Sequence, residues 1–81
     1  MHLEIITPDK KVFEGEVIGA KFPGVKGSFE VLNNHAPLIS TLENGTVRIT
    51  TTAGQHYFNI DGGVVEVLNN NIIVLAESVI D

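Results

Sequence analysis

The chain has 81 residues, 43% of them hydrophobic, which suits one small domain with a thin core and is too many for a disordered chain. Its formal charge of -5 would repel a phosphate backbone, so no nucleic-acid partner is expected; the acidity either suits a basic protein partner or keeps the domain soluble. Cysteine is absent, which excludes disulfides and thiolate metal sites and favours an intracellular, reducing location.

The sequence predicts short strands in place of helices. The β-branched residues Val, Ile and Thr fill 25 of the 81 positions, and Gly, Pro or an Asn pair recurs at short intervals. We expect strands near residues 2–7, 11–15, 16–22, 27–32, 37–40, 45–52, 55–60, 63–68 and 71–76. Many short strands with turns about every 8 to 12 residues indicate an all-β fold, an antiparallel two-sheet sandwich or flattened barrel. Neither a linker nor an internal repeat interrupts the sequence, so residues 1–81 are expected to form one domain.

The start of the chain shows no export signal, because residues 1–4 contain neither a basic region nor an apolar block. The longest uninterrupted apolar run, Ile72 to Ala76, is far shorter than the ~20 residues that cross a bilayer. We therefore expect the protein to stay in the compartment where it is made.

The segment from Gly27 to Gly45 is the most informative part of the chain. It places an Asn-Asn-His-Ala-Pro corner between two apolar strand candidates and ends on an Asn-Gly turn. Pro37 cannot donate to a sheet ladder, and it pushes Ala36 toward an extended conformation, so backbone chemistry fixes the corner. A corner held in this way positions a surface, which favours a docking module over an enzyme.

Alternation of apolar and polar residues supports the later strands. Val47 and Ile49 share one face of their strand, and Val65 and Val67 do the same. Residues 72–76 lack alternation, which predicts a strand covered on both faces. Large aromatic side chains are expected in the core, namely Phe13, Phe22, Phe29 and Phe58.

Three local signals mark turns or kinks. Residues 50–55 predict a hairpin, and Asn69-Asn70 can adopt the positive φ values of a tight turn. Gly62-Gly63 indicates close strand approach or a bulge, because no phosphate-loop motif surrounds it.

The residues suited to chemistry do not form a recognisable site. The three histidines, His2, His35 and His56, lack the short spacing of metal ligands, so no metal site is predicted. Ser28 is not embedded in a nucleophile motif, and the sequence predicts neither catalytic nor cofactor-binding residues.

His35 and Glu30 each allow two roles. The His35 ring is either a hydrogen-bonded structural plug beside the proline or an exposed interface contact. Glu30 either lies on a solvated strand face or contacts a partner.

Several segments share their order and spacing with one protein family. They are Leu3 to Pro8, Val12 to Gly15, Gly27 to Leu38, Leu42, Gly45 to Ile49, Gly62 to Val67 and Val74 to Ala76. Together they resemble the N-terminal β-domain of the epsilon subunit of F-type ATP synthases over essentially the whole chain. The specific part is His-Ala-Pro-Leu followed later by Gly-Gly before an apolar strand.

This resemblance implies a two-sheet sandwich of about ten strands. It also implies a noncatalytic subunit in the central stalk of the rotary motor, which docks the gamma subunit to the ring of c subunits and couples proton flow to ATP synthesis. The implied location is peripheral, on the cytoplasmic face of a bacterial inner membrane, and no ATP binding is expected. By position, the gamma-facing residues are Thr7, Leu38 and Ser40. The residues near the c-ring are Ser28, Glu30, Asn33, Asn34 and His35.

The sequence departs from the family pattern in several places. Ser28 stands where many relatives carry a ring-contacting glutamate, and Glu30 stands where a glycine is usual. The corner lacks the proline that commonly lies two positions before His35. Relatives continue into a helical hairpin with inhibitory and ATP-sensing behaviour, whereas the given sequence ends at Asp81. The fold expected for residues 1–81 therefore has no helical hairpin, and the sequence assigns neither behaviour to it.

Two other functional classes are alternatives. One is a small jelly-roll-like metalloenzyme built on His35 and His56, which requires a stoichiometric transition metal. The other is a ligand-binding β-sandwich, which requires a sizeable closed pocket.

Overall fold

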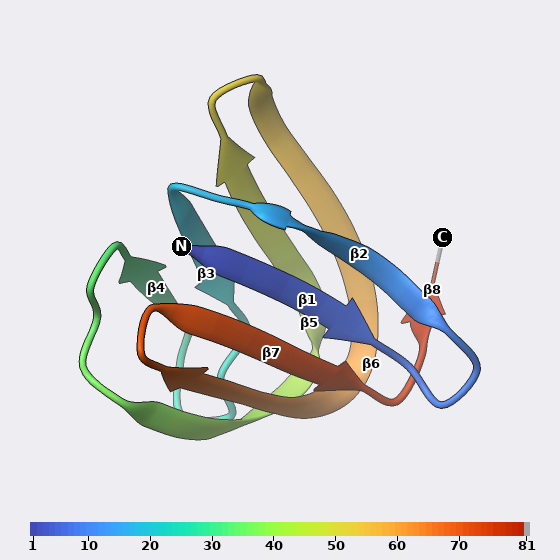
Figure 1. Cartoon of the computed structure of the whole chain (residues 1–81). Coiled ribbons are helices and arrows are strands. Elements are labelled where there is room, and N and C mark those ends of the chain that lie inside the picture. The colour runs from blue at the N-terminus through green and yellow to red at the C-terminus, as the bar shows by residue number, and fades with distance from the viewer. Residues whose placement is uncertain (81) are drawn as a thin grey trace.

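The computed structural model describes residues 1–80, so the expected domain end at Asp81 lies outside the description. Within these residues all regular structure is β-strand, which confirms the predicted all-β class (Figure 1). The strands are β1 (His2–Ile6), β2 (Lys11–Glu16), β3 (Gly19–Phe22), β4 (Phe29–Leu32), β5 (Leu38–Thr51), β6 (Gly54–Leu68), β7 (Asn71–Ala76) and β8 (Val79–Ile80). The described residues contain no helix long and apolar enough to cross a membrane.

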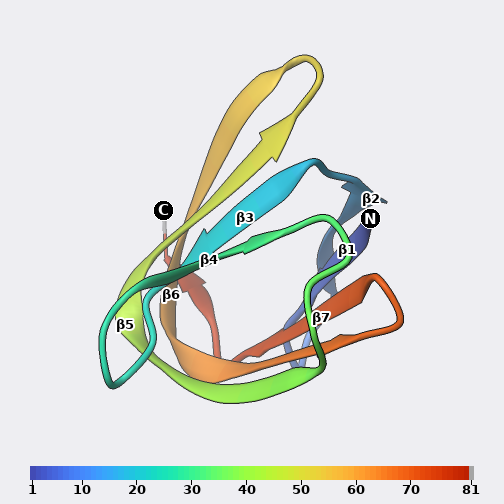
Figure 2. The ribbon, with the colours of Figure 1, turned by 90° about the vertical axis from the view of Figure 1, so that its left-hand side faces the viewer.

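The strands are joined in the order β2-β1-β7-β6-β5-β3-β4, and β8 pairs with β6 outside this path. The end of β6 pairs with β7, whereas the end of β5 pairs with β3. Figure 2 shows β5 and β6 curving from one layer into the other and projecting as a hairpin. The sandwich therefore consists of two layers that share their longest strands.

β5 and β6 replace four of the shorter strands predicted from the sequence. β5 continues through Asn44 and Gly45, so the predicted turn at this dipeptide is wrong. Asn44 pairs with Asp61 on β6, and its side-chain amide donates to the Asp61 carboxylate at 3.1 Å. A Cβ at Gly45 would lie 2.7 Å from the Cβ of Pro23. Glycine at this position thus lets the loop after β3 cross the strand.

Gly62 and Gly63 form the bend in β6. Their φ angles are 84° and 152°, which residues other than glycine rarely adopt. A Cβ at Gly63 would collide with the backbone oxygen of Leu75 on β7. The prediction of close strand approach at this pair is confirmed.

The two predicted turns after the strand candidates are also confirmed. Thr51 pairs with Gly54 across the β5–β6 hairpin. Asn69 and Asn70 have φ angles of 51° and 62° in the turn between β6 and β7, which asparagine tolerates better than most residues.

A single apolar cluster fills the space between the layers. Its members include the four residues predicted from alternation, which are all nearly inaccessible to solvent: Val47, Ile49, Val65 and Val67. Among the phenylalanines only Phe22 is fully buried, while the other three are partly buried against the cluster. Phe22 packs on Phe29, and Phe13 packs on Phe58, with ring centroids 5.7 Å apart in both pairs.

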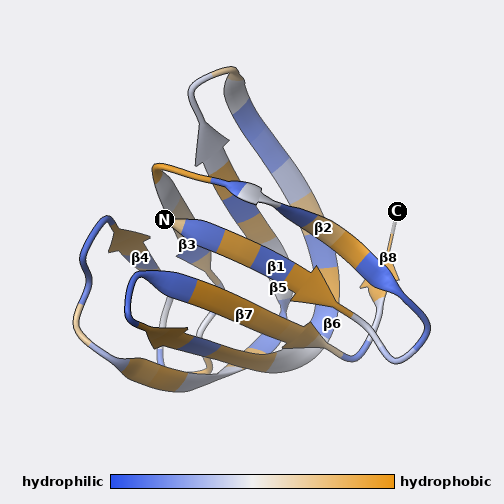
Figure 3. Cartoon of the chain, viewed as in Figure 1, coloured by the Kyte–Doolittle hydropathy of each residue, from blue (hydrophilic) through white to orange (hydrophobic). Residues whose placement is uncertain are grey.

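The prediction that residues 72–76 are covered on both faces is wrong. Ile72, Val74 and Ala76 are buried, but Leu75 is 53% exposed. β7 lies between β1 and β6, so its hydrogen-bonding edges are paired while only its inner face meets the core. Figure 3 shows that β7 is hydrophobic along most of its length. The sequence shows no alternation of apolar and polar residues here because both faces of β7 carry apolar side chains. Those on the outer face lie at the surface.

Candidate functional site

The corner after β4 is fixed by amide hydrogen bonds. Asn34 has a φ angle of 62°, and its backbone N–H donates to the side-chain oxygen of Asn70 at 2.8 Å. The Asn70 amide nitrogen donates to the side-chain oxygen of Asn33 at 3.0 Å. The turn between β6 and β7 therefore holds the corner in place, although Asn33, Asn34 and His35 are all exposed.

Of the two roles considered for His35, the structure favours an exposed interface contact. Its Nδ1 lies 2.7 Å from the carbonyl oxygen of Ala36, where it can donate a hydrogen bond. The ring is not buried, so it does not plug the core. Nε2 makes no hydrogen bond to residues 1–80 and is available to a partner.

Ser28 and Glu30 lie at the other end of β4, which is an edge strand. Glu30 is exposed, and its carboxylate accepts a hydrogen bond from the Arg48 guanidinium at 3.0 Å. Lys21 is the residue opposite both Glu30 and Arg48 on neighbouring strands. The Glu30 charge is thus partly neutralised within the domain.

The five residues assigned to the c-ring side are spread along β4. Ser28 precedes the strand and Asn33 follows it, and the four residues of β4 span about 13 Å. The structure therefore places Ser28, Glu30 and the corner along one sheet edge instead of in one compact cluster.

The three residues assigned to the gamma side occupy two separate places. Thr7 closes the turn between β1 and β2, where its backbone N–H and hydroxyl donate to the Lys10 carbonyl at 2.9 and 3.1 Å. Leu38 and Ser40 lie on β5, separated from β1 by β7 and β6, or about 14 Å across the sheet. Leu38 packs against the core and Ser40 is half-buried, whereas Ile39 between them is 71% exposed.

An exposed apolar surface on β5, β6 and β7 was not anticipated from the sequence. We call it the apolar face, and its members are Ile39, Val64, Leu68 and Leu75. Val64 is the direct neighbour of Leu75, and Ile39 is opposite Glu66 on the same outer side. A surface groove of about 360 Å³ crosses this side between β5 and β6. The signal was present in the sequence as the residues that alternate with buried Val65 and Val67.

The two alternative functions find little support in the geometry. His35 and His56 are both exposed, and neither belongs to the single group of potential metal ligands among residues 1–80. The surface grooves on the described residues have volumes of about 340 to 360 Å³ and open to solvent. These features favour docking surfaces over a catalytic or closed ligand-binding site.

Comparison with known proteins agrees with this assessment. The family model for the ATP synthase, Delta/Epsilon chain, beta-sandwich domain matches residues 1–81. The chain belongs to this family. An ATP synthase epsilon chain from Salinibacter ruber is 38% identical over 95% of this chain, and one from Chlorobium limicola is 41% identical, also over 95%. This chain spans 58% of the first relative and 89% of the second.

A solved structure with the same fold comes from the Tetrahymena thermophila mitochondrial ATP synthase central stalk and c-ring. The match has a TM-score of 0.83, covers 99% of this chain and 65% of that chain, and is 19% identical in sequence. At this identity the likeness concerns the fold, and the family assignment rests on the closer sequence relatives.

Proposed function

We propose that the chain is a noncatalytic central-stalk subunit of a proton-translocating F-type ATP synthase. In this role it docks the gamma subunit to the c-ring and couples proton flow to ATP synthesis. The observation that carries the proposal is the family match over residues 1–81, joined by epsilon chains 38% and 41% identical to it. A sandwich with a buried apolar core and two separate exposed surfaces suits a subunit that contacts two partners.

The complex is membrane-associated, and this subunit belongs to its peripheral portion. Because the two relatives described above are bacterial epsilon chains, the proposed location is the cytoplasmic face of a bacterial inner membrane. Contact with the membrane is then indirect, through the c-ring.

The apolar face is the proposed gamma-docking surface. Stable protein interfaces have an apolar centre surrounded by polar residues. Ile39, Leu68 and Leu75 supply such a centre, and the sequence-based candidates Leu38 and Ser40 border it on β5. Thr7 lies beyond β1, at the margin of the same sheet.

The edge of β4 and the adjoining corner form the proposed c-ring surface. Ser28, Glu30 and His35 are exposed along it, and the Asn70 clamp fixes the corner without burying it. The Glu30 carboxylate forms an ion pair with Arg48 within the domain. Its negative charge also suits basic loops on a partner.

The test uses membranes rebuilt with complexes that contain Glu30→Lys or His35→Ala. Glu43→Lys is the matched charge reversal, because Glu43 is exposed on β5 outside both proposed surfaces. ATP synthesis and proton pumping are measured beside thermal melts of the free chain. His35→Ala should keep the free energy of unfolding within about 0.5 kcal/mol of the unmodified chain. Glu30→Lys replaces the ion pair with Arg48 by neighbouring like charges and should lower it by about 1 kcal/mol. Both variants should lower coupling, whereas the control should leave stability and coupling unchanged.

Normal coupling in both surface variants would remove the β4 edge from the c-ring contact. Failure of the unmodified chain to enter the complex at all would contradict the proposed function itself.

A further inference from the structure

Four side chains with metal-binding chemistry share the outer side of β1 and β2. In the antiparallel ladder His2 is opposite Glu16, and Glu4 is opposite Glu14. Directly opposed side chains lie on the same side with Cβ atoms about 4.5–5.5 Å apart. The strand register therefore brings one imidazole and three carboxylates together without a contribution from any loop.

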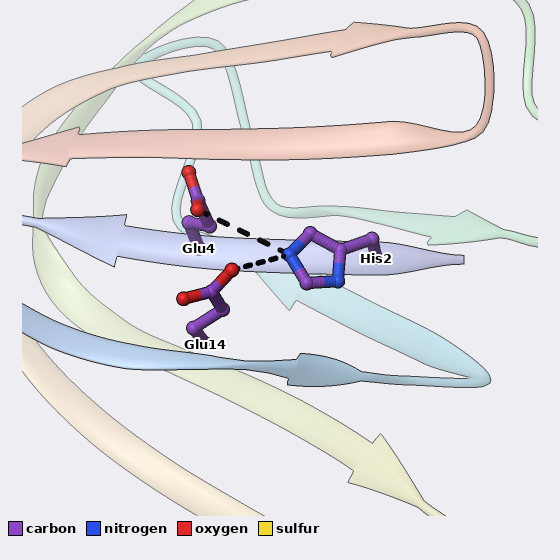
Figure 4. A group of neighbouring side chains, drawn as sticks. All are labelled: His2, Glu4 and Glu14. Atoms are coloured by element: carbon purple, nitrogen blue, oxygen red, sulfur yellow. Dashed lines mark hydrogen bonds and ion pairs between the residues drawn. The ribbon is translucent and has the colours of Figure 1, made fainter.

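His2, Glu4 and Glu14 converge on one point (Figure 4). The Nε2 atom of His2 lies 3.0 Å from Glu14 Oε2 and 4.0 Å from Glu4 Oε1, and one potential ligand atom from each residue lies within 4.8 Å of the others. Tetrahedral zinc sites with bonds of about 2.0–2.2 Å place their ligand atoms about 3.3–3.6 Å apart. A small side-chain adjustment thus converts this group into three corners of a tetrahedron.

The two ring nitrogens of His2 face carboxylates on different sides. Its Nδ1 lies 3.2 Å from Glu16 Oε2, while its Nε2 faces Glu14 at 3.0 Å. A neutral imidazole has only one N–H group, so it can satisfy only one of these carboxylates. When Nδ1 donates to Glu16, Nε2 is the ring atom directed at Glu14 and Glu4, and it is the atom placed to bind a metal ion.

Glu16 supplies the outer partner that zinc-binding histidines commonly have. A carboxylate on the second ring nitrogen fixes the tautomer and the ring orientation of the ligand. Among residues 1–80, two cations form ion pairs with these carboxylates: Lys11 lies 3.1 Å from Glu4 and 2.8 Å from Glu14, and the terminal amine lies 3.6 Å from Glu16. Lys11 is therefore a competitor for the same carboxylates.

We propose that His2, Glu4 and Glu14 bind one Zn²⁺ ion, with Glu16 orienting the imidazole. An imidazole with two carboxylates suits zinc better than the hard cations, which prefer all-oxygen sites. A water molecule completes the tetrahedron, since the His2 and Glu14 side chains are 36% and 42% exposed. The ion joins β1 to the edge strand β2.

The test is calorimetric titration of zinc chloride into the purified chain in mildly alkaline, chelator-free buffer. One ion should bind per chain, and magnesium should give no signal. His2→Gln and Glu14→Gln should abolish zinc binding, and Glu16→Gln should weaken it about tenfold. Lys11→Met should strengthen binding because the competing ammonium is removed.

The matched control is His56→Gln, which removes an exposed imidazole on the projecting hairpin and should leave zinc binding unchanged. Equal affinity in His2→Gln and the unmodified chain would overturn the site. Loss in His2→Gln with full binding in Glu14→Gln would also overturn it, because the ion would then not join β1 to the carboxylate on β2. NMR of the unmodified chain gives a readout independent of variant folding: zinc should shift the His2 ring signals, and shifts confined to His35 or His56 would contradict the assignment.

Discussion

The inner and outer sides of β5, β6 and β7 carry similar residues with opposite roles. Val65, Val67 and Val74 face inward and are inaccessible, whereas Val64 and Leu75 face outward and are 38% and 53% exposed. Hydrophobicity alone does not separate the two groups. The two groups are separated by their position in the two-residue period of the strand, because successive side chains point to opposite sides. One side of the same apolar strand therefore packs in the core, and the other is exposed to a partner.

The largest expected effect separates the two sides by stability. Ile72→Ala leaves a cavity under β7 and should lower the free energy of unfolding by about 2–5 kcal/mol. Leu75→Ala, on the opposite side of the same strand, should change it by no more than about 0.5 kcal/mol. Denaturant melts of both variants measure the difference, and equal destabilisation would contradict the assignment of inner and outer sides.

A second expected effect concerns binding of the outer side to the gamma subunit. Ile39→Asp places a charge in the middle of the apolar face and should weaken association with the gamma subunit by more than about tenfold. Thr46→Asp, exposed farther along β5, is the control and should bind normally. Binding of purified gamma subunit is measured by calorimetry, and normal affinity of the Ile39 variant would move the gamma contact elsewhere.

A smaller effect is expected at the clamped corner, which lacks the burial that stabilises the inner side. Asn70→Ala removes the hydrogen bonds to Asn33 and Asn34 and places alanine at a φ angle of 62°, so it should cost about 1–2 kcal/mol. The exchange of the backbone amide of Asn34 should accelerate at the same time. Asn59→Ala, which removes only one surface bond to Thr46, is the comparison variant. Unchanged amide exchange in Asn70→Ala would show that the corner is held by other contacts.

The smallest effect concerns the polar part of the outer surface. Hydrogen bonds to Glu16 and then to Glu14 raise the pKa of the His2 imidazole above its usual value of 6.5. The folded state therefore favours the imidazolium, and this contribution is complete below pH 6.5 and is lost as the pH rises through the raised pKa. With a chelator present, the melting temperature of the unmodified chain should fall slightly more over this rise than that of His2→Gln. Identical pH profiles would contradict the pKa shift.

The sequence was sufficient for the fold class because local signals agree along the chain. The alternation around Val47 and Val65 and the Asn69-Asn70 turn all match the structure. Strand number was harder to predict, since Asn44-Gly45 has turn chemistry but lies within β5 under a crossing loop. That contact is a tertiary effect with no local signature.

The candidate site was less accessible to sequence reasoning. His35 and Glu30 could be named as surface candidates, but the partners that orient them, Ala36 and Arg48, appear only in three dimensions. The proximity of His2 to Glu4, Glu14 and Glu16 was not predicted, because these side chains come from two strands whose register the sequence does not specify. Positions 2 and 4 together with 14 and 16 become a recognisable pattern only once β1 and β2 are paired.

The continuity of β5 and β6 has a mechanical consequence. Their ladder runs from Leu38 paired with Val67 to Thr51 paired with Gly54, through both layers of the sandwich. A force that pulls the two strands past each other along their length loads all the hydrogen-bonded pairs at once. A force that peels the strands apart breaks these pairs one at a time. A push on the apolar face that runs along β5 is therefore carried to the tip of the hairpin as shear, the direction in which a β-ladder yields least.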